Sequence, residues 1–138
     1  MHKCCQDASA HASITCSDVP RRWSCWDRDR QARRRWLWSF VTETLIAAAP
    51  DGTEAHYYRT ATGTEADLVL TLPGGKLWAV EIKRSSAPTV EGGFHIACAD
   101  LKPSRRFVVY SGNERFPLNA DTDAIGLSDL GRALQAAA

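Results

Sequence analysis

The most constraining feature of the sequence is a pair of alternating segments joined by a glycine turn. Residues 65–72 read Glu-Ala-Asp-Leu-Val-Leu-Thr-Leu, residues 77–83 read Leu-Trp-Ala-Val-Glu-Ile-Lys, and Pro-Gly-Gly-Lys lies between them. Apolar and polar residues alternate with period 2 in both segments, which is typical of half-buried β-strands, and Pro-Gly-Gly is typical of a turn. The sequence therefore predicts a β-hairpin over residues 65–83.

The register of this hairpin follows from its apolar faces. One face would carry the apolar residues of both strands, namely Ala66, Leu68, Leu70 and Leu72 with Trp78, Val80 and Ile82. A slip of one residue would turn one of these sets toward water, so the loop must be centred on Gly74. The predicted cross-strand pairs are Leu70 with Trp78, Leu68 with Val80, and Ala66 with Ile82.

On the opposite face, the same register places Asp67 against Glu81 and Glu65 against Lys83. Two carboxylates directly opposite each other repel, and one of them should resist ionisation unless a cation lies between them. A divalent metal would resolve the conflict, and carboxylate oxygens suit Mg or Mn. The alternative is an ordinary surface hairpin end that carries solvated charges.

Residues 1–38 differ in composition from the rest of the chain. They hold four of the five Cys, four of the five Trp and eight of the seventeen Lys and Arg, but little Leu, Ile or Val. Such a segment cannot bury enough apolar surface to offset its ordering entropy, so we predict a disordered or non-native leader. Two alternatives are a zinc site, although no Cys-x-x-Cys pair is present, and an Arg- and Trp-rich arm that binds nucleic acid.

Residues 39–138 are predicted to form one α/β domain. Periodicity and turn residues indicate, in order, a helix over 39–49, a strand over 55–60, the hairpin, a helix over 89–101, a strand over 105–110, an extended piece over 124–127, and a helix capped by Ser128 that runs through Leu134. The helix between the hairpin and the next strand predicts a parallel crossover.

An Asp on one strand followed by Glu-x-Lys on the next resembles the constellation of the PD-(D/E)XK nuclease superfamily. In that superfamily the two acids hold the metal, the Lys positions the attacking water and steadies the phosphate, and a Glu of the first helix often faces the metal. The resemblance implies a restriction-endonuclease-like mixed sheet flanked by helices. It also implies metal ligands at Asp67, Glu81 and Glu43 and a catalytic role for Lys83, alongside those three acids.

A narrower resemblance covers about residues 39–134. Segments 57–60, 63–70, 78–85, 93–95 and 106–110 are similar, in order, to a domain of unknown function that follows an AAA-type ATPase domain in bacterial and archaeal proteins. The resemblance implies an AAA-type ATPase domain as partner in full-length relatives. The chain itself contains no Gly-x-x-x-x-Gly-Lys-Ser/Thr motif, so we expect no ATP hydrolysis.

Three functions fit these features. The first is a Mg- or Mn-dependent phosphodiesterase that acts on DNA, as a stand-alone or truncated copy of the ATPase-linked domain. The second is a non-catalytic interaction or regulatory module, and the third is a gene remnant without activity. No apolar run reaches membrane-spanning length and no signal peptide is visible, so we expect no membrane partner and a cytoplasmic location.

Overall fold

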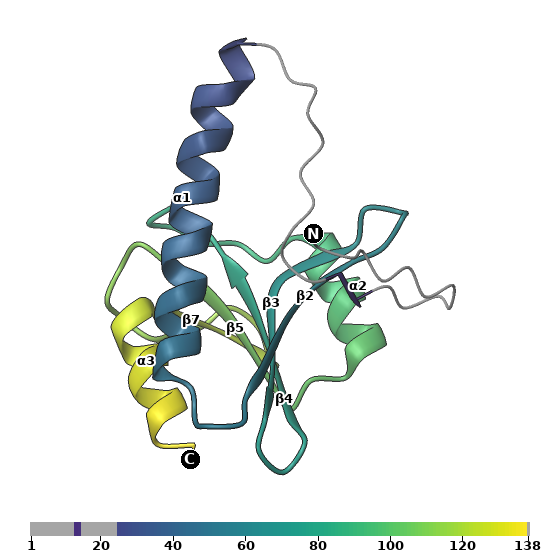
Figure 1. Ribbon diagram of the computed structural model, residues 1–138, viewed down its shortest axis with the longest axis vertical. Helices are drawn as coiled ribbons and strands as arrows, with labels where there is room; N and C mark the ends of the chain where they lie inside the picture. Colours follow the sequence, from purple (N-terminus) through teal and green to yellow (C-terminus); the bar gives the residue numbers. More distant parts are fainter. Residues whose placement is uncertain (1–12, 15–24, 138) are drawn as a thin grey trace, which may run out of the picture.

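A computed structural model describes residues 13–14 and 25–137, with side chains described from residue 35 onward (Figure 1). Its seven-stranded sheet has the order β1-β2-β3-β4-β5-β7-β6. The strands are β1 (Ser13–Ile14), β2 (Glu54–Arg59), β3 (Glu65–Leu72), β4 (Lys76–Ile82), β5 (Arg105–Tyr110), β6 (Phe116–Pro117) and β7 (Thr122–Gly126). Strands β4, β5 and β7 run parallel, and the other neighbours are antiparallel.

In the described part of the chain, three helices cover the sheet. Helices α1 (Cys25–Ala48) and α3 (Leu127–Gln135) pack together on one face, and α2 (Gly92–Leu101) lies on the other face against β3 (Figure 1). Helix α2 connects the parallel strands β4 and β5, as predicted from the sequence. The predicted α/β class with a mixed sheet between helices is therefore confirmed.

The hairpin of β3 and β4 has the predicted register over most of its length. Leu70 lies opposite Trp78, and Leu68 lies opposite Val80. The turn is centred on Gly74, and both Gly74 and Gly75 have positive φ, at 86° and 78°, where a side chain would be strained. The position of the turn and the pairing of Leu68 and Leu70 are therefore as predicted.

The predicted register is wrong at the open end of the hairpin. The β3–β4 pairing ends at Leu68 and Val80, so the expected cross-strand pair of Asp67 and Glu81 does not form. On the other side of β3, Asp67 and Leu68 together lie opposite the single residue Tyr57 of β2, which is a β-bulge. The extra residue reverses the alternation, so Ala66 packs on the α2 side of the sheet instead of beside Leu68.

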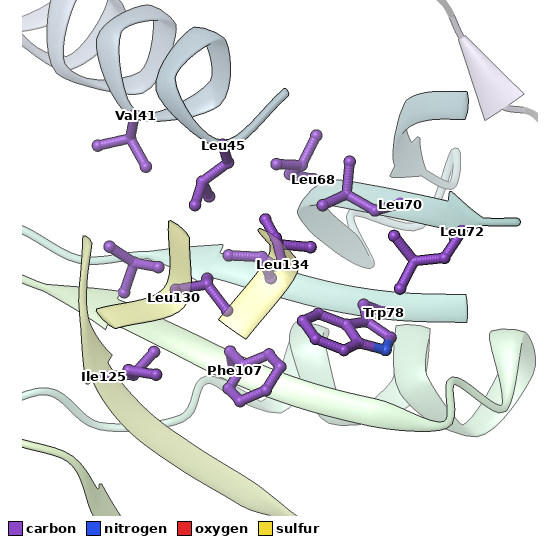
Figure 2. Packing of buried hydrophobic residues seen from close by; sticks show 12 residues of the cluster. Val41, Leu45, Leu68, Leu70, Leu72, Trp78, Phe107, Ile125, Leu130 and Leu134 are labelled. Carbon is purple, nitrogen blue, oxygen red and sulfur yellow. The ribbon is translucent and has the colours of Figure 1, made fainter. Parts of the chain in front are cut away.

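The main core lies between the sheet and the helices α1 and α3. Figure 2 shows leucines of both helices directed at the apolar residues of the strands. The buried residues that meet there are Val41, Leu45, Leu68, Leu70, Leu72, Trp78, Val80, Phe107, Val109, Ile125, Leu130 and Leu134. A smaller cluster around Phe94, Ala97 and Cys98 holds α2 against the other face. The sheet is thus buried on both sides and forms a rigid support for its strand ends.

Helix boundaries differ from the sequence predictions in two places. Helix α1 begins at Cys25 instead of Ser39, so it starts within the segment predicted as a leader, while residues 1–12 and 15–24 of that segment lie outside the described residues. Helix α3 begins after Gly126, and Ser128 is not its cap. Among the described residues, no helix is long and apolar enough to cross a membrane.

We expect the substitution Leu45→Ala to lower the free energy of unfolding by about 2–5 kcal/mol, because Leu45 is fully buried and its removal leaves a cavity. The neighbouring residue Ile46 is 43% exposed, so Ile46→Ala should cost less than about 1 kcal/mol. Urea unfolding of both variants measures the difference. Equal losses would show that α1 does not pack on the sheet through Leu45.

Candidate active site where β3 and β4 separate

A cleft of about 520 Å³ opens where β3 and β4 separate. Charged side chains dominate its lining, namely Asp67, Glu81 and Lys83 with Arg35, Arg59, Glu65, Arg84 and Glu91. The structure therefore brings three of the four predicted site residues into one place. We refer to this cleft below as the fork.

Asp67 lies in the β-bulge. At the end of the hairpin its carboxylate takes the place of a backbone carbonyl of β3 as hydrogen-bond acceptor. The backbone N–H of Ile82 donates to Asp67 Oδ2 at 2.8 Å. Burial raises the pKa of Asp67 above its usual value, although the hydrogen bond from Ile82 and the charge of Lys83 oppose the rise. The bulge thus aims a carboxylate that resists ionisation into the space between the strands.

Glu81 is the only charged residue that is buried among the described residues, at 6% exposure. Its Oε1 lies 2.7 Å from Lys83 Nζ, while its Oε2 is buried with no hydrogen-bond donor among the described residues. Burial raises the pKa of Glu81, and the hydrogen bond from Lys83 only partly offsets this rise. A buried acceptor oxygen that lacks a donor among the described residues would be satisfied by a cation or a water that reaches it.

The side chain of Lys83 links the end of β4 to the start of α2, because its ammonium contacts both Glu81 and Glu91. Burial alone would lower the pKa of its ammonium, but its hydrogen bonds to Glu81 and Glu91 outweigh burial and raise the pKa. Glu91 is the N-cap residue of α2, and its exposed carboxylate contacts the same ammonium. Glu91 was not predicted from the sequence, because only the path of the loop after β4 brings this residue back to the fork.

Glu43 is not brought to the fork. Its side chain is exposed on α1 and lines a different cleft, between α1 and β2. The part of the chain that the structure describes contains no group of three or more His, Cys, Asp or Glu side chains placed to hold a metal ion. A metal at the fork would therefore rely on Asp67 and Glu81 without Glu43.

The charges that line the fork balance. Four basic side chains face four acidic ones, and some are already paired, since Arg59 Nε lies 3.9 Å from Glu65 Oε2. Three of the cations are arginines, whose planar guanidinium groups suit phosphate oxygens. The geometry thus offers two carboxylates for a cation and three arginines for an anion.

We expect the substitution Asp67→Asn to stabilise the protein at pH 7 in metal-free buffer. The folded protein holds a proton on Asp67 more tightly than the unfolded chain does, so stability falls as pH rises above the usual Asp pKa of 3.8 and through the raised folded pKa. Asparagine keeps an acceptor for the Ile82 N–H and removes this penalty. Urea unfolding between pH 3 and pH 8 measures the effect.

The matched control is Asp51→Asn, an exposed turn position that does not line the fork. This variant should retain the pH dependence of the parent protein. The explanation fails if Asp67→Asn is less stable than the parent at pH 7, because the carboxylate would then stabilise the fold in its ionised form.

Part of the chain is similar in sequence to longer mycobacterial proteins. Residues of the chain are 38% identical, over 87 positions, to uncharacterized proteins of Mycobacterium tuberculosis and of Mycobacterium bovis. The matched region covers 62% of this chain and 19% of each relative, so the chain spans about a fifth of their length. No solved structure matches. Residues 38–130 match the family described as Domain of unknown function (DUF4143), and the chain belongs to that family.

Proposed function

We propose that the fork is a phosphodiesterase site that uses Mg or Mn and acts on DNA. The observation that supports this most directly is the meeting of Asp67, Glu81 and Lys83 in one cleft, with Glu81 Oε2 buried and without a donor among the described residues. Two acids and a lysine on separating strands also agree with the PD-(D/E)XK pattern in the sequence.

The residues of the fork fit a small divalent cation. Burial raises the pKa of both Asp67 and Glu81, and a nearby cation would relieve that penalty. Mg commonly keeps several waters and binds through one or two carboxylates together with substrate phosphates, so a group of three protein ligands is not required. When bound, the cation would lower the pKa of a water and stabilise charge on the phosphate.

Lys83 would then act on the phosphate. Its raised pKa keeps the ammonium protonated at neutral pH, and Glu81 holds that ammonium at 2.7 Å. Glu91 is exposed, so a phosphate oxygen can compete with its carboxylate for Lys83 without breaking the contact to Glu81. The ammonium would stabilise negative charge that develops on the phosphate oxygens.

A second proposal is a regulatory module of an AAA-type ATPase. The mycobacterial relatives extend far beyond the matched region, which makes up only 19% of their length, so in those relatives the matched region is one part of a larger protein. In such a protein the fork could bind DNA or a cation without turnover. Cleavage activity separates this proposal from the first.

We expect calorimetry to detect binding of Mn to the protein at pH 7, and Asp67→Asn to lose it, because one of the two carboxylate ligands is then missing. Asp51→Asn should bind Mn as the parent does. The metal-site proposal is overturned if a folded parent protein binds no Mn, or if Asp67→Asn binds it equally well.

Lys83→Met tests the catalytic proposal separately. The substitution keeps both carboxylates, so Mn binding should persist, while cleavage of single- and double-stranded DNA should fall by about 100-fold or more. An electrophoretic cleavage assay with Mn measures this. Mn binding without any cleavage by the parent protein would favour the regulatory module.

A further inference from the structure

A second cleft, of about 170 Å³, lies between α1 and β2. Trp38, Thr42 and Ile46 are spaced four residues apart on α1 and therefore form one stripe along the helix. His56 and Tyr57 of β2 line the opposite side, and Glu43 also lines the cleft. The cleft thus combines aromatic and aliphatic walls with a few polar groups, as small-molecule sites commonly do.

Thr42 is the feature of this cleft that packing does not explain. The residue is 8% exposed, and its Oγ1 has no hydrogen-bond partner among the described residues. Two positions further along the same helix, the hydroxyl of Thr44 donates to the carbonyl oxygen of Phe40 at 2.7 Å. A buried hydroxyl without a partner destabilises the fold, and this one is shielded from solvent in the free protein. A bound polar group would therefore pair with it only after the Thr42 side chain turns toward the cleft.

Trp38 lines both this cleft and the fork, so the two clefts adjoin at this side chain. The fork is charged, with Lys83, Arg59 and Arg84 in its lining, whereas the second cleft is mainly apolar. A ligand that reaches from one to the other would carry an anionic group at one end and a flat, largely apolar group at the other. A nucleotide has this chemistry.

We propose that the cleft between α1 and β2 binds a nucleobase of single-stranded nucleic acid, with the adjoining phosphodiester in the fork. The position of the phosphodiester rests on the proposed function, but base binding itself requires neither a metal nor cleavage. Bases in a duplex are stacked and paired, so only an unpaired base can enter such a cleft.

The polar groups of the cleft indicate which bases it prefers. The carboxylate of Glu43 can accept a hydrogen bond from an exocyclic amino group, as Glu does from cytosine N4. The hydroxyl of Thr42 can donate or accept at the same edge of the base. Aromatic side chains such as Tyr57 offer a stacking surface. A cleft of this size suits a single ring. The Glu43 acceptor then favours cytosine over uracil, because uracil has an acceptor oxygen where cytosine has its amino group.

The test is a titration of the ¹⁵N-labelled 138-residue protein with cytidine and with uridine in EDTA, followed by NMR. Cytidine should shift the backbone amides of Thr42, Glu43 and Tyr57 and should bind at least about fivefold more tightly than uridine. Glu43→Gln should remove this preference, because an amide can pair with either base. Glu114→Gln, at an exposed position that lines neither cleft, should retain it.

Thr42→Val separates binding from a merely structural role. Valine has nearly the same shape but no buried hydroxyl, so the thermal midpoint should stay equal or rise while cytidine affinity falls. Equal affinity for cytidine and uridine, shifts confined to other parts of the chain, or no nucleoside binding would each overturn the proposal.

Cytidine 5′-monophosphate tests the connection to the fork. It should shift the NMR signal of the Lys83 backbone amide in addition to the amides of the second cleft. Shifts that leave the Lys83 signal unchanged would overturn the proposal that one ligand occupies both clefts. Cytidine binding in EDTA by a protein that binds no Mn would reject the phosphodiesterase proposal alone. Mn-dependent cleavage without cytidine binding would reject the base site alone.

Discussion

The separation of β3 from β4 at Asp67 is the constraint on which the rest of the site depends. Beyond Val80, β4 no longer pairs with β3, and the Asp67 carboxylate accepts the N–H of Ile82 at 2.8 Å. On its other side β4 keeps its partner, since the N–H of Lys83 donates to the carbonyl of Val109 at 2.8 Å. The end of β4 is therefore held between a side chain and a strand, which fixes the positions of Glu81 and Lys83.

This arrangement concentrates charge where burial makes charge costly. Glu81 is nearly as buried as the apolar core, and the pKa values of both Glu81 and Asp67 are raised by that burial. A sheet covered by helices on both faces supplies the rigidity and the apolar burial that offset the cost. Destabilising charges held on a rigid support are typical of functional sites, where stability is traded for activity.

The regular parts of the fold could be predicted from the sequence because local pattern and tertiary burial agree there. The leucines of β3 opposite Trp78 and Val80 gave the hairpin register, and the stripe with Phe94 and Cys98 gave the buried face of α2. The bulge could not be predicted, because Ala66 is apolar and fits either face. Likewise, the contact of Glu91 with Lys83 depends on the path of a loop, and the position of Glu43 depends on how α1 is rotated over the sheet.

Helix α1 links the core to both clefts. Val41 and Leu45 fix its rotation by packing into the core beside Leu68, and the same rotation turns Trp38 and Thr42 toward the space above β2. A shift of α1 would therefore move the shared wall of the clefts without changing the strands that carry Asp67 and Glu81. Packing of α1 against the sheet would then control how the two clefts adjoin and where Arg35 lies at the fork, whereas the strands alone place Asp67 and Glu81.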